Sequence, residues 1–212
     1  MCVLRRRSCV YGYTVLFVVA LCTPARPQQP VPQQRSIKQV FEEDQRDRQH
    51  LDYSKLSKED WQGIQARDAA RSEETKQLVA SGAAKTGEDY RDAAFIFQHG
   101  DKSADFLLAH VLAVAAIAKG DVTATWVSAA TLDRYLQSLK QPQVFGTQYV
   151  LKDPNAMLNN PKAPRMVTQD PYDKNVLSDA LRNVYCVLPY AVQQQNVEAM
   201  NKGQNPQPDS CH

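Results

Sequence analysis

Residues 86–138 read TGEDYRDAAFIFQHGDKSADFLLAHVLAVAAIAKGDVTATWVSAATLDRYLQS. Thr86 followed three residues later by Asp89 resembles a capping box, which predicts that a helix starts here. The run Ser103–Lys119 is apolar on every face, which predicts a helix buried on all sides at the hub of a core. Gly120 then indicates a tight turn into a further helix. The stretch therefore predicts neighbouring helices joined by short turns.

Two helices are predicted before this stretch. A sparse apolar stripe on the charged segment 36–50 is typical of a surface helix. Residues 57–60, Ser-Lys-Glu-Asp, resemble a second capping box and open a long helix that Gly82 ends. The acidic runs Glu42-Glu43-Asp44 and Glu73-Glu74 are interpreted as solvated helix faces.

After Leu139 the composition shifts to a proline-rich segment, which precludes long helices. Residues 144–152 and 166–169 are predicted to form a short β-hairpin across that segment. Helices resume over Ser178–Val184 and from about Pro189, expected as the first helical residue, to Asn201.

The fold class that follows is mainly α, with a Pro-rich loop that can hold a small β-hairpin. Asp89-Tyr90 and Asp121-Val122 lie about one helical hairpin apart, a spacing that suits stacked pairs of the tetratricopeptide or Sel1 type. An ordinary helical bundle with similar hairpins is the alternative, and it is favoured because an array needs at least about three units.

The first 25 residues resemble a secretory signal peptide. Arg5–Arg7 form a basic start, Tyr13–Cys22 is apolar apart from Thr14, and Ala25 ends a segment suited to cleavage. The apolar run is well short of the roughly 20 residues of a membrane-spanning helix. We therefore expect an exported chain, periplasmic or extracellular, with no transmembrane segment once cleaved. Lipoprotein anchoring at Cys22 is the minor alternative.

Residues 26–35 are rich in Pro and Gln and are predicted to be a tether, residues 36–202 a single helical domain, and residues 203–212 a tail. Removing the three arginines of residues 1–25 from the 25 Lys and Arg leaves 22 basic residues against 23 acidic ones, a formal charge of about −1. This balance argues against nucleic acid as a partner.

Cleavage also removes Cys2, Cys9 and Cys22 and leaves Cys186 and Cys211. In an exported chain these two residues predict one disulfide that pins the tail to the domain. Two unpaired thiols are the alternative.

Three polar motifs resemble the signature of a bacterial family of domains of unknown function. They are Gln98-His99, Asp133-Arg134 and the segment Gln143-Val-Phe-Gly-Thr-Gln148, where the family has Gln-x-(Tyr/Phe)-Gly-Thr-Gln. The resemblance covers about residues 40–200 and implies a mainly helical fold with a shared polar cluster, without an activity. Phe145 stands where Tyr is more usual, so a role for a phenol hydroxyl does not carry over.

The motifs define one candidate ligand-binding or structural polar cluster, made of Gln98, His99, Asp133, Arg134, Gln143, Thr147 and Gln148. His99 follows a predicted helix, whose dipole favours a positive imidazole, whereas His110 lies in the most apolar helix and is expected to be neutral. Asp133 has no cation on the adjacent turns, so if buried it needs donors from another segment. Gly146 allows a turn that directs Thr147 and Gln148 to one place.

Several roles are open to this cluster: a structural network that ties the Pro-rich loop to the helices, a cleft for a small ligand or peptide, or catalysis with His99 as base and Asp133 orienting it. The sequence has no metal-ligand spacing, nucleotide loop or nucleophile motif, so no metal and no cofactor are expected. We therefore predict a non-enzymatic binding or interaction module of the cell envelope. Its partner would be a protein, peptide or small molecule of unknown identity, and an envelope hydrolase using His99 and Asp133 is the alternative.

Overall fold

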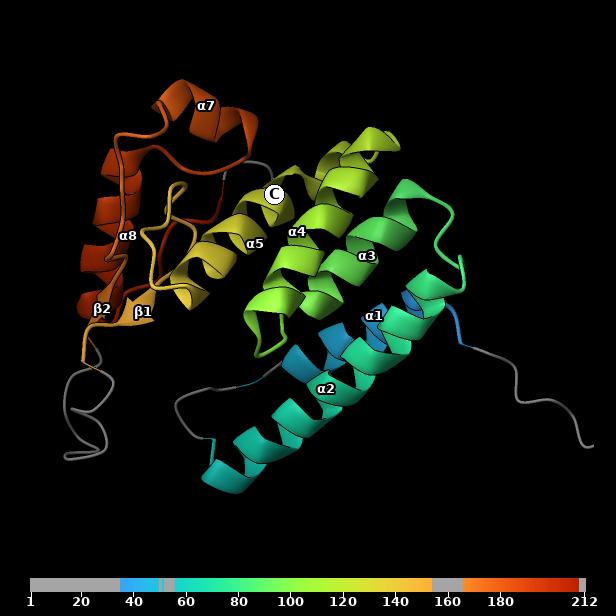
Figure 1. Ribbon diagram of the computed structural model, residues 1–212. Coiled ribbons are helices and arrows are strands. Elements are labelled where there is room, and N and C mark those ends of the chain that lie inside the picture. Colours follow the sequence, from blue (N-terminus) through green and yellow to red (C-terminus); the bar gives the residue numbers. More distant parts are fainter. Residues whose placement is uncertain (1–34, 50, 52–55, 154–165, 210–212) are drawn as a thin grey trace, which may run out of the picture. The chain divides into compact units, whose positions relative to one another are not determined.

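The computed structural model describes residues 35–49, 51, 56–153 and 166–209, and within them it is mainly helical (Figure 1). The elements in chain order are α1 (Ile37–Arg48), α2 (Lys58–Ala80), α3 (Gly87–Phe97), α4 (Ser103–Ala118), the 3₁₀ turn η1 (Val122–Ala124), α5 (Thr125–Ser138), β1 (Val150–Leu151), β2 (Val167–Thr168), α7 (Asp179–Val184) and α8 (Tyr190–Asn201). The predicted fold class is confirmed.

The helix starts follow local capping chemistry. The Ser57 hydroxyl accepts from the Asp60 amide, and the Asp60 carboxylate accepts from the Ser57 amide. Thr86 and Asp89 make the same reciprocal pair at the start of α3, so both predicted capping boxes are confirmed. Each pair satisfies amide groups that the first turn of a helix leaves without partners.

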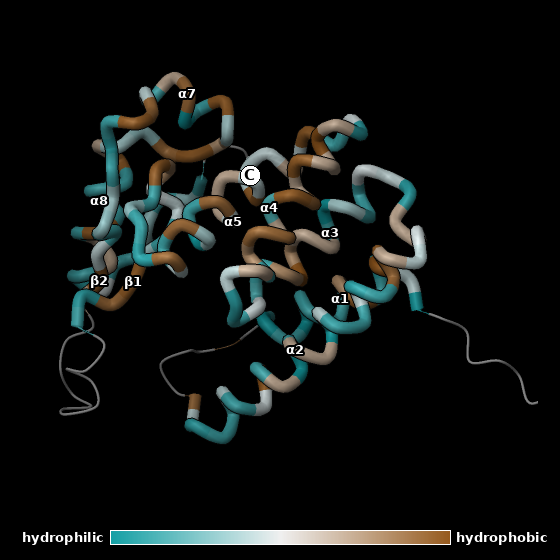
Figure 2. Tube along the Cα trace, viewed as in Figure 1, coloured by the Kyte–Doolittle hydropathy of each residue, from teal (hydrophilic) through white to brown (hydrophobic). Residues whose placement is uncertain are grey.

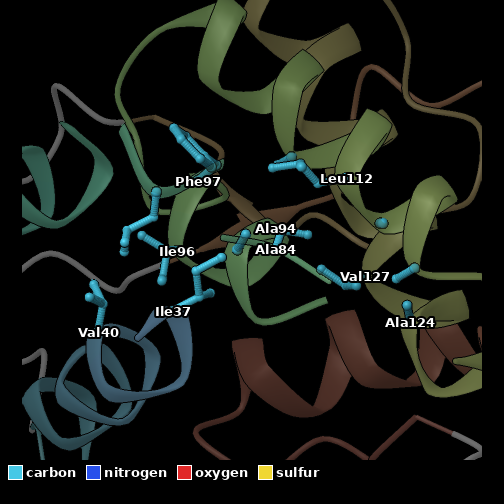
Figure 3. Close-up of a cluster of buried hydrophobic side chains, with 14 residues drawn as sticks. Ile37, Val40, Ala84, Ala94, Ile96, Phe97, Leu112, Ala124 and Val127 are labelled. Carbon is cyan, nitrogen blue, oxygen red and sulfur yellow. The ribbon is translucent and has the colours of Figure 1, made fainter. Parts of the chain in front are cut away.

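Alanine-lined contacts hold the centre of the domain together. α4 packs against α3 and α5, and small side chains such as Ala94 and Ala113, both fully buried, let the helix backbones approach closely. α1 contributes Ile37 and Val40 to the same cluster, which Ile96 and Phe97 complete (Figure 3).

The predicted burial of α4 on all sides is wrong. Ala109, Leu112, Ala113 and Ala116 face the core, but Leu107, Val111 and Val114 are 41%, 54% and 48% exposed. In the described chain α3 and α5 cover only part of the circumference of this helix, so its remaining face is open to solvent.

The hairpin predicted across the Pro-rich segment is present but short. β1 and β2 are antiparallel, with Val150 opposite Thr168 and Leu151 opposite Val167. Residues 144–149, which were predicted as part of the first strand, form an irregular loop. Pro189 lies at the N-cap of α8 and not at its first helical residue.

Residues 203–209 of the tail lie against the domain. The Asn196 amide donates to the Gln207 carbonyl oxygen at 2.9 Å and its oxygen accepts from the Gln207 amide at 2.8 Å, while the Trp126 indole donates to Asp209 at 2.6 Å. Cys186 is disulfide-bonded, and its predicted partner Cys211 lies outside the described residues.

The predicted signal peptide, including Cys22, and all but the last residue of the tether also lie outside the described residues. Within the described part of the chain no helix is both long and apolar enough to cross a bilayer.

Candidate functional site

Asp133 of α5 is fully buried and anchors the loop formed by residues 143–148. One carboxylate oxygen accepts from the amides of Val144 and Phe145, at 2.8 and 3.0 Å. The other accepts from the amide and the hydroxyl of Thr147, at 2.9 and 2.8 Å. Four donors therefore replace the water that this carboxylate would bind in solution.

Gln143 and Gln148 close the ends of the same loop. The buried Gln143 side chain accepts from the Gln148 amide at 3.0 Å and donates to the Gln148 carbonyl oxygen at 2.9 Å. The Gln148 side chain donates to the Ala130 carbonyl oxygen of α5 at 3.2 Å. The loop is thus held mainly by side chains, while the Gln143 backbone also pairs with residues 171–173: its amide donates to the Pro171 carbonyl oxygen and its carbonyl oxygen accepts from the Asp173 amide.

Gly146 is required at the centre of the loop. Its φ is +86°, and a Cβ built on it would lie 2.0 Å from the side-chain oxygen of Gln193. The neighbouring Phe145 is buried with Ala129 and Val187, and its ring centroid lies 4.8 Å from that of Tyr185. A phenyl ring suits this position because its surroundings are apolar.

Arg134 lies next to Asp133 in the chain but projects to a different environment. Its Nε donates to the Gln148 side-chain oxygen at 3.1 Å and its Nη1 to the Gln98 carbonyl oxygen at 3.0 Å. Both acceptors are neutral, and no carboxylate within the described residues forms an ion pair with Arg134. Burial and the nearby charge of Arg48 lower the pKa of this guanidinium. Arg134 is therefore a partly buried cation with no counterion among the described residues.

His99 follows the end of α3 and pairs with α1. Its Nδ1 lies 3.1 Å from a carboxylate oxygen of Asp44. No hydrogen bond or ion pair of the described chain joins His99 to Asp133, whose oxygens are occupied by the loop.

His110 lies apart from both residues. Its Nδ1 lies 2.9 Å from the Ser128 carbonyl oxygen, which can only accept, so this nitrogen carries a proton.

A buried network of charges joins α1 to α2. Arg48 contacts Asp44 and Asp68, each at 2.9 Å, and Arg71 contacts Asp68 at 2.5 Å. Asp44 is fully buried, so the interpretation of its acidic run as a solvated face is wrong at this residue; Glu43 is more than a third exposed. The carboxylate can be buried because two arginines and His99 surround it.

Asp47 extends this network towards solvent. Burial alone would raise its pKa, but hydrogen bonds from Arg67 and Arg71 outweigh burial and lower the pKa below its ordinary value of 3.8. Burial likewise opposes the charge of Arg71, whose pKa is nevertheless raised by its bonds to Asp47 and Asp68. The charges of this network therefore stabilise one another at neutral pH.

A cavity of about 610 Å³ opens beside these groups. We call it the Arg134 pocket. Its lining comes from α1, α2, α3, the α3–α4 turn, α4 and α5, and includes Arg48, Trp61, Ile64, Asp68, Phe97, His99, Asp101, Lys102, Asp105 and Arg134. The volume lies within the range of about 300–1,000 Å³ that is usual for small-ligand sites.

The structure thus divides the predicted cluster into two parts. Asp133, Gln143 and Thr147 belong to the loop network, whereas His99 and Arg134 line the pocket. Gln148 joins the two parts, because it accepts from Arg134 and pairs with Gln143, whereas Gln98 accepts from Arg134 through its backbone carbonyl.

Sequence reasoning missed the contributions of Arg48 and Asp68 to the pocket. A signal was present, since the buried face of α2 reads Ile64, Asp68, Arg71, Thr75 and Leu78. Charges on the same face as the apolar residues indicate a buried ion pair and not a solvated surface. In the described chain no three His, Cys, Asp or Glu side chains are grouped to hold a metal ion.

Comparison with models of protein families, with curated proteins and with solved structures finds no match to this chain. Inferences about function therefore rest on the pocket and its charges.

Proposed function

We propose that the chain is an exported, non-enzymatic binding module of the cell envelope, and that the Arg134 pocket takes a small ligand bearing a carboxylate or phosphate group. The observation that carries the proposal is the unmatched charge of Arg134 beside a cavity of ligand size. Its Nη2 makes no hydrogen bond to any residue that the structure describes. An anion beside this nitrogen would supply the missing counterion.

Four basic side chains (Arg48, Lys76, Lys102, Arg134) and four carboxylates (Asp68, Glu73, Asp101, Asp105) line the pocket, so an anion is favoured by the local position of Arg134 and not by the net charge of the lining. Asp68 is paired with Arg48, and Asp105 accepts the Lys102 amide at the start of α4. The exposed side chains of opposite sign around the pocket, Glu73 and Asp101 against Lys76 and Lys102, offset one another. A negative group of a ligand is therefore favoured beside Arg134, which forms no ion pair with a carboxylate of the described residues.

The remaining lining indicates an apolar part of the ligand. Trp61, Ile64 and Phe97 all line the pocket. These three side chains form an apolar patch within a lining that is otherwise largely polar or charged, and sites that bind small molecules combine apolar contact with a few polar anchors. We favour binding over the predicted alternative of hydrolysis because Asp133 does not contact His99 and no hydroxyl or thiol of the described residues is hydrogen-bonded to it.

Isothermal titration of the mature chain tests the proposal, with sodium phosphate and sodium succinate as probes at constant ionic strength. We expect binding of one or both anions, and Arg134→Gln should weaken it at least about tenfold, because a charged hydrogen bond contributes about 1.5–3 kcal/mol. Arg67→Gln is the matched control, since Arg67 is half exposed and does not line the pocket. If the Gln variant unfolds, Arg134→Lys serves in its place, because it keeps the positive charge and removes the guanidinium geometry. Failure of the wild type to bind either anion, or unchanged binding by a folded Arg134 variant, would refute the proposal.

A further inference from the structure

The open face of α4 carries a regular apolar stripe. Leu107, Val111 and Val114 are 41–54% exposed, and the exposed Ala104 and Ala118 extend the stripe at its ends. No polar or charged side chain interrupts it, and the helix is hydrophobic over most of its length in Figure 2. Single exposed apolar residues are common on protein surfaces, but a continuous stripe over four turns marks a contact surface.

The spacing of the stripe identifies what fits it. From Ala104 to Ala118 the steps are three, four, three and four residues, which is the a/d repeat of a helix that packs lengthwise against another helix. None of the flanking positions, Ser103, Leu108, His110, Ala115 and Ile117, is a Lys, Arg, Asp or Glu. The flanking positions therefore cause no charge repulsion between two copies of the chain.

We propose that this stripe pairs two copies of the chain, α4 against α4 in antiparallel orientation about a two-fold axis near Val111. The stripe is close to symmetric about that residue. Antiparallel pairing places Val111 against its equivalent, Leu107 against Val114 of the second copy, and Ala104 against Ala118. Such an isologous contact is the commonest form of dimer interface, and the small end residues allow the helices to approach closely.

The charges at the ends of the stripe select the antiparallel orientation. Asp101 precedes the helix and Lys119 follows it; both are exposed, and neither forms an ion pair within the described chain. Antiparallel pairing brings Asp101 of each copy to Lys119 of the other, whereas parallel pairing brings like charges together. Antiparallel pairing also sets the two helix dipoles in opposite directions, which is the favourable arrangement for neighbouring helices. Exposed ion pairs contribute little affinity, so the charges set orientation and the apolar stripe supplies the association.

Sedimentation velocity over a range of concentrations tests the association. The wild-type mature chain should shift from monomer to dimer as its concentration rises, and Val111→Asp should remain monomeric. At a low concentration, where both are monomers, the two melting temperatures should agree, because Val111 is solvent-exposed in the monomer. Val184→Asp is the control, since Val184 is 65% exposed on α7 and lies off the stripe. A wild-type chain that stays monomeric up to high concentration, or a Val111→Asp chain that still dimerises, would overturn the proposal.

Disulfide crosslinking tests the orientation. Val111→Cys should crosslink to itself under oxidation. Leu107→Cys should not, because in the antiparallel pair its two copies lie about 12 Å apart along the helix axis. A mixture of Leu107→Cys and Val114→Cys chains should give the heterodimer, and the wild type controls for the native cysteines. Self-crosslinking of Leu107→Cys with no mixed product would show parallel pairing and refute the antiparallel arrangement.

Discussion

Thr147 donates twice to a single oxygen of Asp133, through its amide at 2.9 Å and its hydroxyl at 2.8 Å. With the amides of Val144 and Phe145 on the other oxygen, the carboxylate holds a loop that lies outside both strands. Asp133 therefore accepts four of the hydrogen bonds that hold the 143–148 loop, and Gln169, Tyr172 and Gln193 donate to carbonyl oxygens of the loop.

Asp133→Asn should destabilise the domain by about 2–4 kcal/mol. The Asn side chain has one acceptor oxygen where Asp133 has two. Its NH₂ group would replace the second oxygen and cannot accept the hydrogen bonds that this oxygen receives. Urea unfolding measures the loss. Stability that is unchanged or raised would show that Asp133 is held under strain for a function.

Thr147→Val should cost less, about 1–2 kcal/mol, because the backbone amide still donates to Asp133. The two substitutions act on one pair of groups, so the double variant should show a coupling energy of about 0.5 kcal/mol or more. Additive losses would contradict a shared network.

Gly146→Ala should destabilise the domain by more than Gly120→Ala. Both glycines have positive φ, +86° and +92°, so both substitutions carry backbone strain of about 1–2 kcal/mol. Only at Gly146 does the added Cβ meet another group, the Gln193 oxygen at 2.0 Å, while nothing lies within 4 Å of a Cβ at Gly120. The difference in unfolding free energy should exceed about 1 kcal/mol. Equal losses would mean that Gln193 moves away freely.

Leu112→Ala should cost about 2–5 kcal/mol through lost apolar burial and the cavity left behind. Leu112 is 3% exposed on the core side of α4. Val184→Ala, at an exposed site on α7, should change stability by less than about 0.5 kcal/mol. A loss below about 1 kcal/mol at Leu112 would show that α4 is not central to the core.

Local signals explain how much of this fold was predictable. The start of α2 depends on Ser57 and Asp60, three residues apart, so the sequence contains the whole determinant. The open face of α4 has no such local signal, because a helix that is apolar all round does not indicate which side its neighbours leave uncovered. That side is decided by where α3 and α5 pack.

In the candidate site, too, some contacts have a local signal in the sequence and others depend on how the helices pack. The burial of Asp44 depends on Arg48 in its own helix, on Arg71 in α2 and on His99 beyond α3. Only the pairing with Arg48, four residues away, is visible in the sequence. The catalytic alternative paired His99 with Asp133 from their chemical types, whereas the observed pairing of His99 with Asp44 requires the packing of α1 against α3.

The network around Asp47 should make the domain sensitive to acid. The pKa of Asp47 is lower in the folded state than its ordinary 3.8, so its stabilising effect is complete above that value and is lost as the pH falls through the folded-state pKa. The difference in unfolding free energy between the wild type and Asp47→Asn should therefore be greatest near pH 7 and shrink towards the pH of acid unfolding. Chemical denaturation at several pH values measures it.

Asp92→Asn is the control, because the pH dependence of its effect on stability should have the opposite sign. Burial raises the pKa of Asp92 above 3.8 despite its bond to Arg91, so the folded state holds a proton more tightly than the unfolded chain. Its charged form is therefore disfavoured by folding, and the wild type should lose stability relative to Asp92→Asn as the pH rises from 3.8 through the folded-state pKa. Parallel pH profiles for the two variants would contradict the assignment of Asp47 to a stabilising ion network and of Asp92 to a site dominated by burial.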